Sequence, residues 1–187
     1  VMRFSALMPI HRGTSRGKLE ECFQSLSKQS MPAEEIVILF DGPVSCGVDT
    51  CVSSFKTTLP LRLVRFENNR GLGPVLREGV IICKHNLVAR IDSDDRCIED
   101  RFELQLRHLR DNESISVVGG GLREWYPTGK GYKSMIRNGP LDPVEITSSA
   151  RNRNPMNHQT VMFLKSAVLD CGNYEDLPMF EDYLLWA

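Results

Sequence analysis

The chain has 187 residues and a formal net charge of −1, with 41% hydrophobic and 25% charged residues. This length and composition fit an ordinary globular protein with one substantial hydrophobic core. The near-zero charge excludes the strong positive field by which proteins recruit nucleic acid, so we expect no nucleic-acid partner.

Strand-like and helix-like segments alternate along the first part of the chain. Short apolar runs predict strands, and apolar residues three or four positions apart predict helices. The strands are expected at residues 3–8, 35–40, 61–66, 87–91 and 115–122, and the helices at 17–29, 73–86 and 99–112. Repeated strand–helix alternation is typical of βαβ units, and it predicts an α/β fold with a mainly parallel, Rossmann-like sheet flanked by helices.

The regular alternation ends after Leu122. Residues 123–157 are rich in Gly, Pro, Asn and Arg and predict no regular element. A strand is expected at 158–165 and a last helix from residue 178 onward. Because the sequence stops at Ala187 within that helix, we expect a single domain that is truncated at its C-terminus.

The cysteines and the N-terminus indicate the compartment. Six cysteines contain no C-x-x-C pair and lie mostly within apolar segments, which favours buried, reduced thiols over a disulfide framework or a zinc site. The N-terminal residues show no secretory signal, and no apolar run reaches the length of about 18 residues that a membrane-spanning helix needs. We therefore expect a cytoplasmic protein.

Carboxylates follow two of the predicted strands. Asp41 comes directly after the second strand, and the stretch ARIDSDDR places Asp92, Asp94 and Asp95 after the fourth. In an open parallel sheet these positions meet at the carboxyl edge, where ligands bind. Carboxylates this close raise the cost of ionising one another, and a bound cation removes that cost. The D-x-D pattern therefore predicts a site for Mg²⁺ or Mn²⁺, shared with a phosphate-bearing ligand.

Other motifs fit these residues less well. An EF-hand loop beginning at Asp92 would require glycine where Cys97 stands. The segment GTSRGK (13–18) is one residue short of a P-loop, and GLGPVLREG (71–79) lacks the last glycine of a dinucleotide-binding motif. A polar turn, with one aspartate capping the helix that follows, explains one of the acids after the fourth strand more easily than three.

Acidic residues also open the last predicted helix, in the segment MFEDYLLW (179–186). The helix dipole favours acids in a first turn, and this alone accounts for Glu181 and Asp182. The functional alternative makes Asp182 a general base that takes a proton from an attacking hydroxyl. His158, upstream in NPMNHQTVMF, is expected to be a half-exposed structural histidine and not a ligand.

Taken in order, these segments resemble a family 2 glycosyltransferase with the GT-A fold, of the kind that assembles bacterial capsular polysaccharides and exopolysaccharides. The resemblance rests on SALMPIHRG, EIVILFDGP, ENNRGLGPVLREGV, ARIDSDDR, NPMNHQTVMFLKSAVLDCGNYED and FEDYLLW, and it covers nearly the whole chain. It implies an inverting, metal-dependent enzyme of the hexosyltransferase type. Such an enzyme moves a sugar from a nucleoside-diphosphate sugar, most often a UDP-sugar, to a hydroxyl acceptor in cell-surface polysaccharide synthesis.

The resemblance also implies which residues bind the nucleotide. Pro9 and His11 would line the nucleotide pocket, and Asp41 would contact the base. Arg77 falls in the helix on the nucleotide side, where the family more often has Asn. Phe40 is a further departure, because the family often has an acid at that position.

The reaction centre is implied in the same way. Asp94, together with Asp92, would hold Mn²⁺ or Mg²⁺, and Asp92 would also touch the ribose or the donor sugar. Asp182 matches the catalytic base of inverting members, with Glu181 beside it.

The resemblance divides the chain, residues 1–187, into two parts of one GT-A catalytic domain. Residues 1–122 would bind the nucleotide sugar, and residues 123–187 would face a saccharide or lipid-linked saccharide acceptor. Further acceptor contacts, a further metal ligand and any membrane-associating helices would lie beyond Ala187. This arrangement would allow peripheral association with the inner face of the plasma membrane.

Two other functions remain open from the sequence. A nucleotidyltransferase acting on sugar phosphates uses a similar sheet and paired acids, with a Gly-rich basic loop after the first strand that PIHRGTSRGK matches faintly. A non-catalytic sugar- or metal-binding domain would use the same acids only as helix caps and turns.

Overall fold

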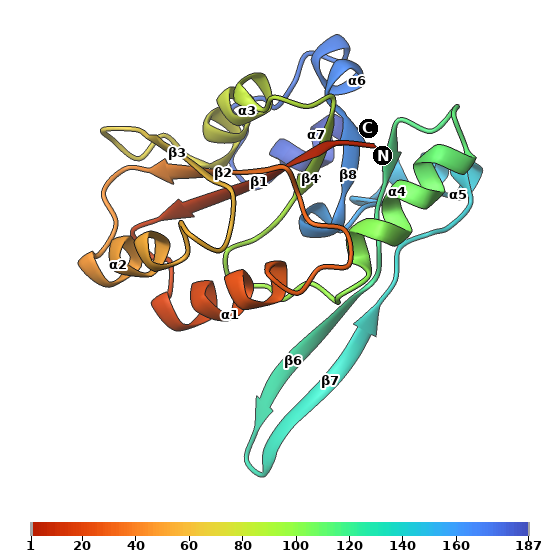
Figure 1. Cartoon of the computed structure of the whole chain (residues 1–187). Helices are drawn as coiled ribbons and strands as arrows, with labels where there is room; N and C mark the ends of the chain where they lie inside the picture. Colours follow the sequence, from red (N-terminus) through yellow and green to blue (C-terminus); the bar gives the residue numbers. More distant parts are fainter. Residues whose placement is uncertain (1, 187) are drawn as a thin grey trace.

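A computed structural model describes residues 2–186 and shows one central sheet between two layers of helices (Figure 1). The six strands of this sheet are β1 (Phe4–His11), β2 (Glu35–Asp41), β3 (Leu61–Arg65), β4 (Leu87–Arg90), β5 (Val117–Val118) and β8 (Met162–Leu164). A separate two-stranded hairpin consists of β6 (Leu122–Thr128) and β7 (Gly131–Arg137). The helices are α1 (Arg16–Leu26), α2 (Cys46–Ser54), α3 (Leu72–Ile82), α4 (Arg101–Asp111), α5 (Pro143–Ala150), α6 (Lys165–Asp170) and α7 (Glu181–Trp186), with a 3₁₀ turn at His158–Thr160.

The sheet is mainly parallel, as the sequence predicts. Its strand order is β3-β2-β1-β4-β8-β5, and β1 pairs in parallel with both β2 and β4. Strand β8 runs antiparallel to β4 and to β5. The carboxyl ends of β1, β2 and β4 therefore lie side by side at one edge of the sheet, which is where such sheets bind ligands.

Alternate residues of the central strands face opposite helix layers. Ala6 and Met8 of β1 pack in the core beneath α1, α2 and α4, whereas Leu7 packs in the core beneath α3, α6 and α7. Both faces of β1 and β2 are buried, which explains why each reads in the sequence as a continuous apolar run. Each large apolar side chain buried in this way contributes about 1.5–3 kcal/mol to folding.

Strand β1 continues beyond its predicted end, through Pro9 to His11. Proline has no N–H to donate, so a proline within a sheet must face a side without a partner. The carbonyl of Leu7 accepts from Ile91 on the β4 side, and Pro9, two residues later, faces the same side after β4 has ended. The strand therefore keeps its pairing with β2, which extends to the pair His11 and Asp41.

The structure adds elements that the sequence did not predict, namely α2, the β6–β7 hairpin, α5 and α6. Strand β5 is also shorter than expected, because the glycines at 119–121 provide no side chains to pack. All six cysteines are free, but only three of them are buried, and Cys46 and Cys171 are exposed. Within residues 2–186, no helix has the length and apolar character needed to cross a bilayer.

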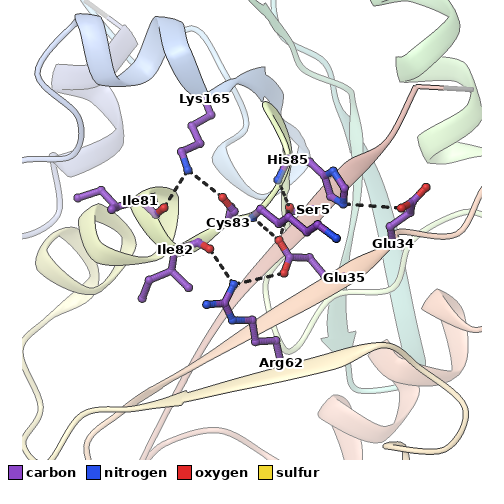
Figure 2. A network of polar contacts seen from close by, with 10 residues as sticks. Ser5, Glu34, Glu35, Arg62, Ile81, Ile82, Cys83, His85 and Lys165 are labelled. Atoms are coloured by element: carbon purple, nitrogen blue, oxygen red, sulfur yellow. Dashed lines mark hydrogen bonds and ion pairs between the residues drawn. The ribbon is translucent and has the colours of Figure 1, made fainter.

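A buried carboxylate joins the amino-terminal ends of the strands, at the edge opposite to the acids described above (Figure 2). Glu35 accepts a hydrogen bond of 2.6 Å from the Ser5 hydroxyl and another from the Lys84 backbone N–H, and it lies 3.6 Å from the Arg62 guanidinium. Lys165 donates to the carbonyls of Ile81 and Cys83, so it caps the end of α3. This network fixes the turn between α3 and β4.

Replacing Glu35 by Gln should lower the free energy of unfolding by about 2 kcal/mol near pH 7, because the neutral amide weakens the hydrogen bonds that Ser5 and Lys84 donate to Oε1 and turns its NH2 group towards the Arg62 guanidinium. Burial alone would raise the pKa of Glu35, but the hydrogen bonds from Ser5 and Lys84 and the Arg62 charge lower it below its ordinary value of 4.5. The ionised carboxylate therefore stabilises the fold above pH 4.5, and this contribution is lost as the pH falls through the lowered pKa.

Urea unfolding at pH 7 and at pH 3.5 measures how much free energy of unfolding Glu35→Gln removes. This loss should be large at pH 7 and smaller at pH 3.5. Glu34→Gln is the matched control, because Glu34 is exposed and pairs only at the surface with Arg3 and His85. An effect of Glu35→Gln no larger than that of the control would contradict the role given to the buried carboxylate.

Candidate active site

A cavity of about 310 Å³ lies at the carboxyl ends of β1, β2 and β4. The structure brings five of the predicted site residues together in its wall, namely Pro9, His11, Asp41, Asp92 and Asp94. The loop before α3 and the first turns of that helix close another side of the cavity. The volume falls within the range of about 300–1,000 Å³ that is typical of small-molecule sites.

Asp41 is held by the loop that precedes α3. One carboxylate oxygen accepts from the backbone N–H of Arg70 at 2.5 Å, and the other accepts from Asn69 Nδ2 at 2.8 Å and from the Gly71 N–H at 3.1 Å. Gly42 makes this closure possible, because its φ is +79° and a Cβ there would lie 2.7 Å from the Asn69 nitrogen. Asp41 therefore shapes the cavity as well as lining it.

Asp92 is paired with an arginine that sequence reasoning missed. The guanidinium of Arg90, at the end of β4, is almost completely buried, and its Nη2 lies 2.7 Å from an Asp92 carboxylate oxygen. Among the residues described, Nε and Nη1 of Arg90 find no hydrogen-bond partner. A buried charge is costly unless it is paired, so Arg90 fixes the position of Asp92 from beneath the cavity.

Asp94 and Asp95 differ in their exposure to solvent. Asp94 is exposed, and the Lys18 ammonium lies 3.5 Å from it, in a solvent-screened pair that contributes little to stability. Burial, together with the charges of Asp92 and Asp94, raises the pKa of Asp95 to about 6. The cluster therefore concentrates negative charge at the cavity rim.

The carboxylates of this rim fit a divalent cation that is shared with a ligand. Within residues 2–186, no three His, Cys, Asp or Glu side chains are placed to hold a metal ion without help. Mg²⁺ and Mn²⁺ commonly use one or two carboxylates and complete their shells with phosphate oxygens and water. Asp92 and Asp94 supply such a pair of oxygen ligands on the wall of one cavity, and a cation there would relieve the repulsion that raises the pKa of Asp95.

Arg77, expected on the nucleotide side, does not line this cavity. Its guanidinium donates to the carbonyl of Tyr174 at 3.1 Å, and its own carbonyl accepts from Asn173. These bonds join α3 to the segment that leads to α7, because the sequence places Arg77 on the side of α3 that faces that segment and not the cavity. The position of Arg77 indicates a structural contact.

The acids of α7 lie beside the first turn of α3. Gly73 permits this close approach, because a Cβ there would come within 2.2 Å of the Glu175 carbonyl oxygen. Glu181 is buried and packs next to Gly73, so its side chain serves the contact between α3 and α7. Neither Glu181 nor Asp182 lines the cavity described above, although α3 contacts α7 and also lines that cavity.

Asp182 sits in a polar cluster that brings together distant parts of the chain. Its Oδ2 accepts a hydrogen bond of 2.6 Å from Asn154 Nδ2 and lies 3.9 Å from His158 Nδ1. On the other side of the ring, His158 Nε2 lies 2.9 Å from the Tyr174 hydroxyl. The His158 ring is more buried than expected, and burial, with a smaller contribution from the Arg90 charge, lowers its pKa well below the ordinary value. A neutral His158 forms no strong ion pair with Asp182.

A larger hollow, of about 580 Å³, lies between α5 and the chain that follows β7. Val144 and Glu145 line it from α5, and Asn138 lines it from the other side. None of the predicted site residues reaches this hollow. The smaller cavity is the better candidate for chemistry, because three aspartates line it, Asp41, Asp92 and Asp94.

Comparisons with known proteins agree on one family. The sequence profile described as "Glycosyl transferase family 2" matches residues 5–172. A Haemophilus influenzae protein named "Uncharacterized glycosyltransferase" is 42% identical over 99% of this chain and 68% of its own length. The amylovoran biosynthesis glycosyltransferase AmsE of Erwinia amylovora is 37% identical over 98% and 68%. An Escherichia coli protein named "UDP-Gal:alpha-D-GlcNAc-diphosphoundecaprenol beta-1,3-galactosyltransferase" is 33% identical over 98% and 66%.

The chain also shares its fold with solved structures. S. aureus TarS residues 1–349 in complex with UDP superposes with a TM-score of 0.73 at 18% identity, covering 99% of this chain and 54% of that one. The mannosyltransferase PcManGT from Pyrobaculum calidifontis, in complex with GDP-Man and Mn²⁺, gives a TM-score of 0.70 at 15% identity, covering 97% and 50%. The chain thus spans about half the length of these structures, and the likeness confirms the expected GT-A fold.

Proposed function

The chain belongs to glycosyl transferase family 2, and from that premise we propose that it transfers a sugar from a nucleoside-diphosphate sugar to a hydroxyl acceptor in bacterial cell-surface polysaccharide synthesis. The observation that carries this proposal is the cavity at the carboxyl edge of the sheet, with Asp92 and Asp94 in the same wall as Asp41. The names of the E. amylovora and E. coli relatives support the biological setting, and the second supports a UDP-sugar donor.

The donor would lie along the ends of β1 and β2. Pro9, His11 and the loop that Asp41 holds would surround the nucleoside. The diphosphate would then reach Asp92 and Asp94, and the nearby ammonium of Lys18 would offset part of its charge. A bound Mn²⁺ or Mg²⁺, held by Asp94 with Asp92, would stabilise the negative charge that develops on the leaving diphosphate.

The acceptor hydroxyl would be activated from the side of α7. Asp182 would take its proton while the hydroxyl oxygen bonds to the anomeric carbon and the nucleoside diphosphate leaves with the electrons of the broken C–O bond. A single displacement of this kind inverts the anomeric centre and needs no covalent intermediate on the protein. Asn154 would orient the carboxylate of Asp182, and the neutral ring of His158 would lie beside it without forming a strong ion pair. Glu181 would act through packing against α3 and not as a second base.

The two parts of the chain would divide the substrates. Residues 1–122 supply every residue that lines the candidate donor cavity, and residues 123–187 supply the cluster around Asp182. We propose that the second part faces a saccharide or lipid-linked saccharide acceptor, as the name of the E. coli relative suggests. The enzyme would then work in the cytoplasm at the inner face of the plasma membrane.

Incubation with UDP-, GDP- and dTDP-sugars, Mn²⁺ and a saccharide acceptor tests the proposal. We expect release of a nucleoside diphosphate and a product whose anomeric configuration, read by NMR, is opposite to that of the donor. Pyrophosphate release from a nucleoside triphosphate and a sugar phosphate would instead favour a nucleotidyltransferase. If nucleotide sugars bind but neither a nucleoside diphosphate nor pyrophosphate is released with any acceptor, the result would favour a non-catalytic binding domain.

A further inference from the structure

The β6–β7 hairpin projects away from the body of the molecule (Figure 1). Its two strands pair with each other over their whole length, from Leu122 opposite Arg137 to Thr128 opposite Gly131. Every residue of β7 is exposed, and the hairpin forms a sheet of its own. Asn157 anchors only its base, through hydrogen bonds with Arg137 and with the Gly120 carbonyl. An isolated two-stranded hairpin is marginally stable in water, so a partner surface would stabilise this one.

The two faces of the hairpin differ in chemistry. In an antiparallel pair, residues directly opposite each other point to the same face. One face carries Trp125, opposite Ser134, and Tyr132, opposite Pro127, with exposed fractions of 55% for Trp125 and 74% for Tyr132. Ile136, 59% exposed, continues this face towards the base. We call the surface formed by Trp125, Pro127, Tyr132 and Ile136 the aromatic face.

The opposite face carries internal polar contacts, although Tyr126 and Met135 on it stay exposed. The Tyr126 hydroxyl donates to Glu124 at 2.5 Å, and the Arg137 guanidinium lies 3.3 Å from the same carboxylate. Lys133 stands opposite Tyr126 on this face. The aromatic face has no such contacts within the described residues, so it is the face that is free to bind a partner.

The charge of the hairpin is opposite in sign to that of the chain. Residues 122–137 hold four basic residues, Arg123, Lys130, Lys133 and Arg137, and one acid, Glu124, whereas the whole chain carries −1. Lys130 lies in the turn at the tip, one residue pair beyond Pro127 and Tyr132. Basic residues beside exposed Trp and Tyr match an anionic lipid surface, where aromatic rings settle at headgroup level and each Lys or Arg contributes about 1 kcal/mol.

A second copy of the chain fits this surface less well. An aromatic side chain buries about 150–250 Å², so two aromatic residues and an isoleucine stay below the roughly 800 Å² per partner that a specific interface needs. Like charges on two copies of the hairpin would also repel. We propose that the aromatic face and the basic tip dock onto a bilayer that contains anionic phospholipid, and thereby hold the protein at the membrane surface. No residue of this surface belongs to the donor cavity or to the cluster around Asp182.

Flotation with vesicles of phosphatidylethanolamine and phosphatidylglycerol tests the proposal, with phosphatidylcholine vesicles as the neutral comparison. The 187-residue protein should float with the anionic vesicles, and added salt should weaken binding. The double variant Trp125→Ala, Tyr132→Ala should lower the partition coefficient at least about tenfold, and Lys130→Gln should lower it about fivefold. Thermal unfolding should be nearly unchanged in these variants, because the hairpin lies outside both cores.

The matched control is Tyr126→Ala, Met135→Ala, which removes exposed apolar groups from the opposite face of the same hairpin. It should bind the vesicles as the unmodified protein does. Absence of binding to anionic vesicles, or equal losses from the two double variants, would overturn the proposal. A concentration-dependent dimer in sedimentation velocity that Trp125→Ala, Tyr132→Ala abolishes would also overturn it, and would assign the face to a second copy. Any of these results leaves the sugar-transfer proposal unaffected, because that is measured with a water-soluble acceptor.

Discussion

Replacing Asp182 by Asn should reduce kcat for sugar transfer by about 10²–10⁴-fold, which is the usual contribution of a positioned general base. The amide is nearly the same size as the carboxylate, and its oxygen can still accept the hydrogen bond from Asn154. What it loses is the ability to take a proton from the acceptor hydroxyl. The nucleotide Kd should stay unchanged, because Asp182 does not line the donor cavity.

Steady-state kinetics of nucleoside diphosphate release, together with calorimetric titration of the nucleotide, separate these two effects. Asp176→Asn serves as the control, because Asp176 is an exposed acid in the same segment before α7. It should behave as the unmodified enzyme does. Full turnover in Asp182→Asn would remove Asp182 from the mechanism, whatever the result for the donor cavity.

Replacing Asp94 by Ala should weaken nucleotide binding in the presence of Mn²⁺ by at least about 100-fold, since a metal that bridges carboxylate and diphosphate contributes several kcal/mol. In the absence of metal, the variant and the unmodified protein should bind alike, because the exposed Asp94 side chain contacts only Lys18. Calorimetry with UDP, with and without Mn²⁺, gives both values.

Glu99→Ala is the matched control for Asp94, since Glu99 is an exposed acid on the same loop, five residues further along. It should leave the metal-dependent affinity unchanged. If Asp94→Ala bound nucleotide as tightly with Mn²⁺ as the unmodified protein does, the metal-binding role of the D-x-D pair would be wrong. A loss of affinity that is the same with and without metal would point to direct contact of Asp94 with the ligand.

The parts of the fold that could be predicted are those whose apolar pattern is strong. Strands β1, β2 and β4 are buried on both faces, and α4 has one clear apolar face, so each is visible in the sequence. The hairpin could not be found in this way, because neither of its faces packs on the core. Helix α2 did leave a signal: Ser45 caps it, and the buried Val48, Cys51 and Val52 follow at helical spacing.

The candidate site was predictable to the same extent. The acids at strand ends lie together because parallel strands bring their carboxyl ends to one edge, which is a property of topology. No comparable rule predicts which loop residues will contact one another. Asn69 and Asp41 are separated by 28 residues, as are Asn154 and Asp182, and no periodic pattern links either pair. Arg90 was missed for another reason, since a single arginine in an apolar strand is more often expected at the surface than beneath an aspartate.

The direction of the Arg77 side chain could not be predicted from a resemblance. A family can indicate that a helix lies on the nucleotide side, but the direction of one side chain depends on what packs beside it. Here the segment before α7 approaches α3 closely at Gly73, and the carbonyl of Tyr174 becomes the nearest acceptor for Arg77. The same approach buries Glu181, whereas Asp182 keeps some exposure beside Asn154 and His158.

A crystal soaked with MnCl₂ and UDP, with data collected at the manganese absorption edge, tests most directly whether a cation joins the protein to the leaving group. We predict one anomalous peak within bonding distance of a carboxylate oxygen of Asp94 and of both phosphates, in the cavity between Asp41 and Asp92. A cavity without manganese or nucleotide, with the Asp94 side chain still turned towards Lys18, would contradict the account.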